Sequence, residues 1–191
     1  DSVTLDLHKW LHIPFEAACV LVRDRRAHRE AFALTPEYLE KTERGLASGS
    51  LWFSEYGLQL SRGFRALKVW LSIKEHGLDR FGRLIDRNIA QAHELAALVQ
   101  AEPDLELLAP VATNIVCFRY NPGGLSDEQL NALNEELLIR LHESGIAAPS
   151  YTTLDGRYCL RAAIVNYRTT SADLPVLVGA VREIGASLPR R

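Results

Sequence analysis

The sequence of 191 residues contains no methionine, no closely spaced pair of cysteines and no long apolar run. No apolar segment approaches the roughly 18 residues that span a bilayer, so we expect no membrane-spanning helix. The formal net charge of −2 gives no electrostatic basis for binding nucleic acid or an anionic membrane surface. Cys19, Cys117 and Cys159 each lie in an apolar stretch, which predicts buried free thiols in a reducing, cytoplasmic compartment.

One lysine near the start of the chain lies in an otherwise apolar segment. The apolar neighbours of Lys9 in the sequence are Leu5, Leu7, Trp10, Leu11 and Ile13. Such a lysine must extend to water, pair with an acid or lose its charge. A desolvated, neutral amine is the nucleophile that condenses with an aldehyde, so Lys9 is a candidate Schiff-base lysine. The alternative is an ordinary lysine at a strand edge with its ammonium in water.

The first third of the chain has the patterns of two strands and a loop. Alternating and continuous apolar residues predict buried strands over residues 3–7 and 17–23. The charged run over residues 24–29 predicts a surface turn. A hydroxyl followed by proline at Thr35-Pro36 predicts a helix start, and the small polar residues over 42–50 predict a mobile loop.

Helical periodicity begins at Leu60 and predicts a helix over residues 60–76 that Gly77 ends. A second helix is predicted over residues 78–100, with Pro103 just past its end. Two consecutive helices of this kind suit a connection between a large and a small domain.

The last part of the chain, from about residue 105, alternates between strand and helix patterns. Ser126 and Gln129 form a capping box that starts a helix, and Gly145 ends it. The other predicted elements are strands over 113–120 and 157–165 and a helix over about 170–188. This order predicts an α+β layer with a mainly antiparallel sheet.

The segment His8-Lys9-Trp10, preceded by Asp1-Ser2 and a short apolar spacer, resembles the cofactor-lysine segment of the group II pyridoxal-phosphate decarboxylases. That family includes the aromatic L-amino-acid, glutamate, histidine and cysteine-sulfinate decarboxylases. The similarity continues in order along nearly the whole chain. The further matching segments are Phe15–Val22, Leu34–Leu39, Arg62–Trp70, Asn114–Tyr120 and Leu160–Asn166.

The resemblance implies a fold-type-I pyridoxal-phosphate-dependent transferase-like fold, combining α/β and α+β parts. Residues 1–76 would be the end of the large cofactor-binding domain, 77–104 a connecting helix, and 105–191 the small C-terminal α+β domain. The missing initiator methionine and the abrupt start suggest a larger N-terminal portion of the same enzyme. That portion would carry most of the cofactor pocket, including the acid facing the pyridine nitrogen, the ring-stacking residue and the phosphate loop.

The resemblance also assigns roles around the cofactor. Lys9 would form the Schiff base with pyridoxal 5'-phosphate, His8 would lie near the phosphate, and Ser61 would bind the cofactor at a helix start. The alternative for His8 is a structural histidine at a strand end. His8 and His12 are four residues apart, but Pro14 argues against a helix there and no third ligand is evident, so we expect no metal site.

Tyr38 lies in the segment that resembles the family's mobile catalytic loop. A tyrosine on a loop that closes over the site is a suitable acid, and in the family it protonates the substrate Cα across a dimer interface. The alternative is a surface helix residue. Arg62 and Arg65 either reach a neighbouring cofactor or form structural ion pairs, and for Arg161 a structural pair is expected rather than a contact with a substrate carboxylate.

The predicted function is decarboxylation of an L-amino acid, with aromatic ones among the candidates, to the amine and carbon dioxide. The enzyme is expected to be a cytoplasmic homodimer of amino-acid metabolism. Two alternatives are open: a pyridoxal-phosphate-dependent aldehyde synthase or transaminase, and a non-catalytic dimerisation fragment if the chain exists alone. The substrate cannot be read from the sequence, because the pocket for its side chain belongs to the missing portion.

Overall fold

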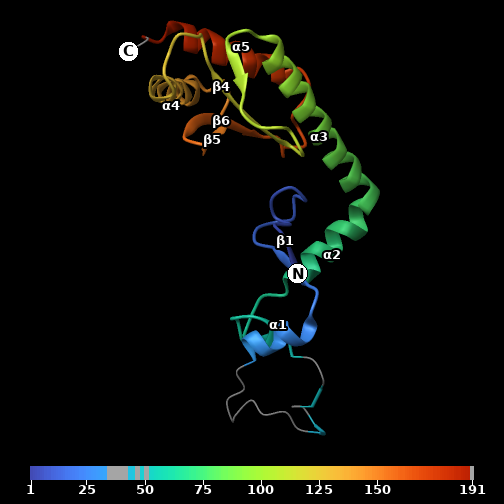
Figure 1. The fold of residues 1–191 in the computed structure, drawn as a ribbon. Helices are drawn as coiled ribbons and strands as arrows, with labels where there is room; N and C mark the ends of the chain where they lie inside the picture. Colours follow the sequence, from blue (N-terminus) through green and yellow to red (C-terminus); the bar gives the residue numbers. More distant parts are fainter. Residues whose placement is uncertain (34–42, 46–47, 50–51, 190–191) are drawn as a thin grey trace. The chain divides into compact units, whose positions relative to one another are not determined.

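The computed structural model describes residues 1–33, 43–45, 48–49 and 52–189 (Figure 1). The chain divides into two compact units, Asp1–Gly77 and Leu78–Arg191, which we call unit 1 and unit 2. Across these described ranges, no helix is both long enough and apolar enough to cross a membrane.

Unit 1 begins with an antiparallel strand pair. Strands β1 (Ser2–Leu5) and β2 (Cys19–Val22) pair with Ser2 opposite Val22. Both predicted strands therefore exist, but their predicted burial is wrong, because all of β1 is exposed and β2 is exposed or half-buried. A two-stranded ribbon has no second layer of its own, and the buried apolar side chains among the described residues of unit 1 are Ile13 and Ala17.

Helix α1 (Arg25–Phe32) replaces the predicted charged turn. Asp24 is its N-cap, and the Asp24 carboxylate accepts hydrogen bonds from the backbone N–H groups of Arg26 at 2.9 Å and Ala27 at 3.0 Å. An aspartate in this position satisfies donors that the first turn of a helix leaves free. The capping residue Asp24 was the sequence signal for this helix. It was missed because the charged run was interpreted as a surface turn.

A short 3-10 helix, η2 (Phe53–Tyr56), packs against α1. The Arg29 guanidinium donates to both carboxylate oxygens of Glu55, at 2.8 and 3.0 Å, and Glu55 is buried. His28 meets the Tyr56 ring edge-on at a centroid distance of 5.2 Å. One bidentate ion pair and one aromatic contact therefore connect two segments that lie more than 20 residues apart.

Helix α2 (Arg65–His76) begins later than the predicted start at Leu60. Gly63 lies just before the helix, and glycine disfavours helical backbone by about 1 kcal/mol relative to alanine. Gly77 ends the helix with a φ of 75°, as predicted. The apolar face of α2 is largely open, with Trp70 56% exposed.

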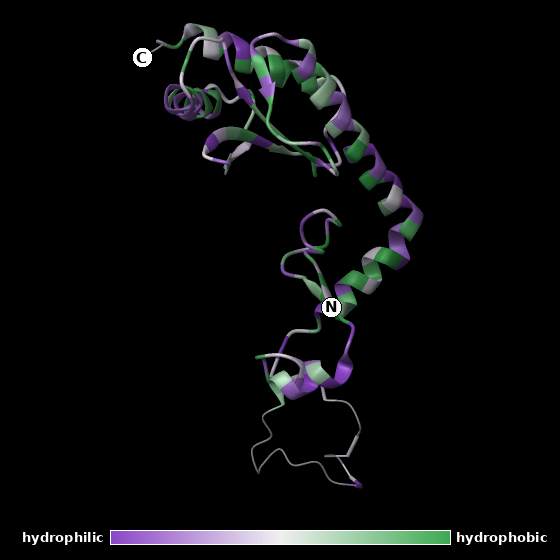
Figure 2. Ribbon diagram, viewed as in Figure 1, coloured by the Kyte–Doolittle hydropathy of each residue, from purple (hydrophilic) through white to green (hydrophobic). Residues whose placement is uncertain are grey.

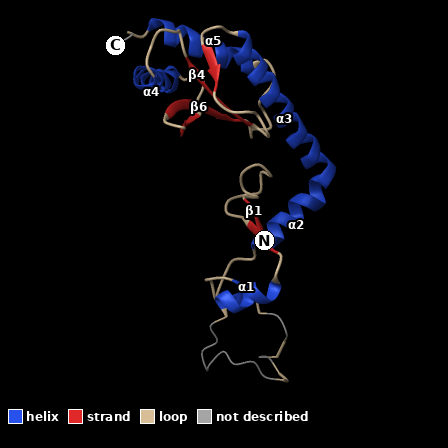
Figure 3. Ribbon diagram, viewed as in Figure 1, coloured by secondary structure: helices blue, strands red, loops and turns tan. Residues whose placement is uncertain are grey.

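Unit 2 is an α+β layer built on a four-stranded antiparallel sheet in the order β3-β4-β6-β5 (Figures 1 and 3). Its elements in chain order are α3 (Leu78–Ala101), β3 (Leu105–Leu107), β4 (Ile115–Tyr120), α4 (Asp127–Ser144), β5 (Ser150–Leu154), β6 (Arg157–Ala163) and α5 (Asp173–Ser187). Helices α3, α4 and α5 pack on one face of the sheet (Figure 1).

The core of unit 2 lies between that sheet face and the three helices. Val116 and Phe118 of β4 and Leu160 of β6 are fully buried in it. The resemblance implies a connecting helix over residues 77–104. Helix α3 covers most of this range and packs into unit 2, because one face carrying residues such as Leu95 and Val99 is buried in this core. The bands of apolar and polar colour along α3 in Figure 2 reflect this amphipathic pattern.

The local signals predicted for unit 2 are confirmed. Ser126 Oγ accepts from the N–H of Gln129 at 3.3 Å, and Gln129 Oε1 accepts from the N–H of Ser126 at 3.0 Å, so the capping box is complete. Gly145 ends α4 in the left-handed conformation, with a φ of 71°. Pro175 lies in the first turn of α5, where its missing N–H costs no helical hydrogen bond.

Candidate active site

Lys9 lies on the turn that follows β1. Its N–H donates to the Asp6 carbonyl at 3.0 Å, and its ammonium forms an ion pair with the Asp6 carboxylate. The Lys9 side chain is 66% exposed, so its amine is not desolvated in the described structure, and the alternative of an ammonium in water is the one present. Its apolar neighbours in the sequence are not packed around the ammonium, because the turn directs Nζ to water and to Asp6. The hydrogen bond from Lys9 lowers the pKa of Asp6, which keeps that carboxylate ionised beside the amine.

His8 is fixed by the backbone of the segment before β2. Its Nδ1 lies 2.7 Å from the Ala17 carbonyl oxygen and 3.3 Å from the Ala17 N–H. The shorter contact favours Nδ1 as the donor, which leaves Nε2 free to accept or, in the protonated ring, to donate. The ring also meets Phe15 edge-on at 5.0 Å between centroids. His8 is thus held at a strand end. This position is compatible with both alternatives for His8, a structural histidine and a residue near a phosphate.

Ser61 and the two arginines do not open a helix together. Ser61 is exposed in a bend four residues before α2, so the predicted helix start at this serine is wrong. Arg65 Nε donates to Glu16 at 2.8 Å, and Arg62 donates to the Phe53 carbonyl oxygen. The structural ion pair that was one alternative for Arg65 is therefore present, and the cofactor contact of Ser61 stays a prediction.

Two further residues complete the account of the predicted site. Tyr38 lies outside the described residues, together with the predicted helix start at Thr35-Pro36. Arg161 lies in β6, where its Nη1 is 3.4 Å from the Ser150 hydroxyl. Within the described ranges, no group of three or more histidine, cysteine or acidic side chains is placed to hold a metal ion.

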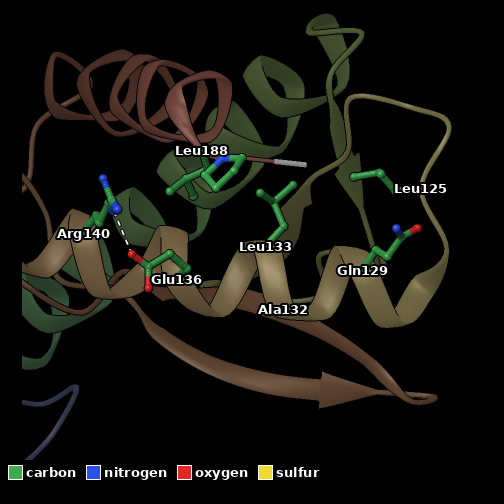
Figure 4. A pocket seen from close by; sticks show the side chains of 8 residues that line it. Leu125, Gln129, Ala132, Leu133, Glu136, Arg140 and Leu188 are labelled. Carbon is green, nitrogen blue, oxygen red and sulfur yellow. Dashed lines mark hydrogen bonds and ion pairs between the residues drawn. The ribbon is translucent and has the colours of Figure 1, made fainter. Parts of the chain in front are cut away.

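Two cavities, one in each unit, do not have Lys9 among their lining residues. In unit 1 a cavity of about 720 Å³ is lined by parts of β2, η2 and α2, with Arg62 and Arg65 among its lining residues. In unit 2 a cavity of about 380 Å³ lies between α4 and the residues that follow α5 (Figure 4). Figure 4 shows the ion pair of Glu136 and Arg140, 2.8 Å long, beside this second cavity. Its lining has no cysteine, lysine or histidine, so it offers none of these groups for catalysis.

The family described as the pyridoxal-dependent decarboxylase conserved domain matches residues 1–121, and the chain belongs to this family. The family resemblance predicted from the sequence is therefore confirmed.

Individual proteins of known activity or structure are similar to this chain. The chain is 36% identical to the aromatic-L-amino-acid decarboxylase of Bacillus atrophaeus, covering 99% of this chain and 40% of that protein. It is 31% identical to the phenylacetaldehyde synthase of Arabidopsis thaliana, covering 86% of this chain and 33% of that protein. The crystal structure of Oryza sativa TDC with PLP and tryptamine superposes with a TM-score of 0.85 at 25% identity, covering 97% of this chain and 39% of the other.

These similarities confirm the predicted fold-type-I class, since the Oryza sativa protein, crystallised with PLP, superposes over nearly the whole of this chain. The chain spans 40% or less of the length of each of these three relatives.

Proposed function

We propose that this chain supplies the attachment lysine and the C-terminal domain of a pyridoxal-phosphate-dependent enzyme that decarboxylates an L-amino acid. The observation that carries the proposal is membership of the pyridoxal-dependent decarboxylase family over residues 1–121. Aromatic substrates are favoured, because the relatives include an aromatic-L-amino-acid decarboxylase and an enzyme crystallised with tryptamine.

The described residues fit this cofactor at its point of attachment. Lys9 carries an exposed primary amine on a turn, so no core has to open for the amine to meet an aldehyde. Asp6 forms an ion pair with that amine, which must lose a proton before it can form a covalent link. His8 directly precedes Lys9, and the contact of its Nδ1 with the Ala17 carbonyl leaves Nε2 as the nitrogen that could contact a phosphate. When bound, the cofactor supplies an electron sink for the bond broken at the substrate Cα.

Tyr38 is proposed as the acid that returns a proton to the substrate Cα. Its support is the position in the segment Leu34–Leu39, which resembles the family's catalytic loop. A phenolic proton donor of this kind accelerates a reaction by roughly 100- to 10,000-fold. Ser61 is proposed as a further cofactor contact on the same grounds.

The assembly is also part of the proposal. The enzyme would be a cytoplasmic homodimer in which each chain contains a larger N-terminal portion in addition to these 191 residues. The coverage of 40% of the Bacillus atrophaeus relative supports the presence of further polypeptide in each chain. Exposed apolar side chains in unit 1, Trp70 and Leu71 among them, supply a surface that such additional polypeptide would cover.

The attachment site is tested on the full-length protein that contains this chain. The protein is incubated with pyridoxal phosphate, reduced with borohydride and digested, and the modified peptide is identified by mass spectrometry. We expect the cofactor mass on Lys9, and its loss in Lys9→Ala. Lys74→Ala is the matched control, since Lys74 is a lysine of α2 far along the chain from the turn and should leave labelling unchanged. Labelling that persists in Lys9→Ala would refute the assignment.

A second candidate reaction has an observation of its own, the similarity to a phenylacetaldehyde synthase. Product analysis with aromatic L-amino acids separates the two reactions. Decarboxylation gives the amine and carbon dioxide, whereas aldehyde synthesis gives the aldehyde with ammonia. Amine as the main product supports the proposal, and aldehyde as the main product contradicts it.

A further inference from the structure

Two cysteines lie side by side in the sheet of unit 2. In the pairing of β4 with β6, Cys117 is opposite Arg161, and Cys159 is two residues before Arg161 on the same face. This face is the one opposite the helices, because side chains alternate along a strand and Val116, Phe118 and Leu160 face the core. Neither cysteine is in a disulfide. Cys159 is fully buried and its thiol donates to the Thr152 carbonyl oxygen at 3.4 Å, and Cys117 is 9% exposed.

The spacing of the pair suits a bridging ion better than a disulfide. Diagonal neighbours on adjacent strands have Cα atoms about 7–8 Å apart, whereas a disulfide needs about 4.4–6.8 Å. An ion between the two sulfur atoms adds two metal–sulfur bonds of roughly 2.3 Å each to the connection. It can therefore join two cysteines that lie too far apart for a disulfide.

We propose that Cys117 and Cys159 form a two-coordinate site for a soft monovalent metal ion of the cuprous type. Binding exchanges two S–H bonds for two metal–sulfur bonds and releases two protons to water, and the ion keeps its oxidation state. Thiolate ligands favour soft ions such as Cu(I). Zinc takes four ligands in structural sites, and the described part of the chain places no third histidine, cysteine or acidic side chain with this pair.

Arg119 offers a hydrogen-bond donor to such a site. Two thiolates and one monovalent cation carry a net charge of −1, which is costly in a buried place without a partner. Arg119 is on the same face of β4, and the next step of the strand register puts it opposite Cys159. Its guanidinium binds Glu106 and Asp127, and its buried Nη1 has no hydrogen-bond partner among the described residues. That unused donor can face the anionic complex.

The composition of the chain makes a sharp test possible. With three cysteines and no methionine, these 191 residues retain sulfur only at Cys117 and Cys159 in the Cys19→Ser variant. The full-length protein that contains this chain is prepared as Cys19→Ser and titrated without oxygen with cuprous ion held by a coloured chelator, and the protons released are counted at constant pH. We expect one ion and two protons per chain, with two sulfur ligands by X-ray absorption spectroscopy.

Two further variants, both made in the Cys19→Ser chain, assign the ligands. Adding Cys159→Ala should abolish the one-to-one complex, and adding Arg119→Gln should weaken it by about 10- to 100-fold, as loss of an outer partner does in other metal sites. Circular dichroism verifies that each variant folds. The proposal is overturned if Cys19→Ser takes no ion from the chelator, if fewer than two protons leave, or if the complex survives Cys159→Ala. Ion uptake and proton release are measured on Cys19→Ser, which leaves the sheet of unit 2 unchanged. These two measurements can therefore overturn the proposal even if a variant in that sheet does not fold.

Discussion

Asn134 should be a major determinant of the stability of unit 2. It is fully buried in α4, where its Oδ1 accepts from the Tyr120 N–H at 2.8 Å. Its Nδ2 donates to the carbonyl oxygens of Tyr120 at 2.9 Å and Leu130 at 2.8 Å. One side chain therefore connects the helix to the end of β4. Asn134→Ala would remove the partner of both backbone groups of Tyr120 in a place that water does not reach.

The expected cost follows from those two groups. An unsatisfied buried donor or acceptor costs about 1–3 kcal/mol, so losing both partners of Tyr120 should lower the free energy of unfolding by roughly 2–6 kcal/mol. That is a large part of the total of about 5–15 kcal/mol that is typical of a domain. Denaturant unfolding followed by circular dichroism measures the change. Tryptophan fluorescence is the wrong probe, because Trp10, Trp52 and Trp70 all belong to unit 1.

A matched control exists on the same helix. Asn131 also makes two backbone contacts, with the Tyr158 N–H at 2.7 Å and the Gly156 carbonyl at 2.8 Å, but it is only half-buried. Water can replace its contacts, so Asn131→Ala should cost about 0.5–1.5 kcal/mol. If the two alanine variants unfold at the same denaturant concentration, burial does not set the cost and the reasoning is refuted.

Three further predictions concern a close contact, a thiol and the proposed acid. Gly185→Ala should destabilise unit 2 by about 1–3 kcal/mol in a denaturant titration, because its Cβ would lie 2.6 Å from the Tyr120 ring, whereas Gly179→Ala, with nothing within 4 Å, should be neutral or stabilising. Burial raises the pKa of the Cys159 thiol from the ordinary value of 9.0 to about 11, so between these pH values the unfolded thiol ionises while the folded one keeps its proton. The free energy of unfolding, compared with that of Cys159→Ala, should therefore fall by about 1.4 kcal/mol per pH unit from pH 9 to pH 11. Equal pH profiles for the two proteins would contradict this. Tyr38→Phe should reduce amine formation by the full-length enzyme about 100- to 10,000-fold without loss of bound cofactor, and an unchanged rate would assign the proton to another group.

The local signals of unit 2 could be predicted because each acts within one turn of chain. The capping box at Ser126 and the glycine stop at Gly145 depend on neighbours three or four residues away, and both are present as expected. The short strands β3 and β5 have no comparable signal: Leu105–Leu107 has three residues, and Ser150–Leu154 is half polar. Their place in the sheet depends on pairing with β4 and β6, which no local pattern specifies.

The family could be predicted from the sequence, whereas the surroundings of the candidate site residues could not. The motif around Lys9 points to the family, and the comparison over residues 1–121 agrees. The ion pair with Asp6 could have been suspected, because the two residues are three apart and a turn brings such residues together. The fixed orientation of His8 could not, since it depends on the Ala17 carbonyl of the following segment.

Alternating apolar patterns lead to opposite outcomes in the two units, and the reason is what packs against each sheet. In unit 2 the alternating residues of β4 and β6 meet three helices, so Phe118 and Leu160 are completely buried. In unit 1 the pattern of β1 and β2 is just as apolar, yet Val3 is 55% and Leu21 58% exposed. A pattern therefore specifies which face of an element is apolar, and burial of that face requires a second layer that the pattern does not identify. Lys9 follows β1 directly and shares this exposure, which is why its apolar sequence neighbours did not predict its surroundings.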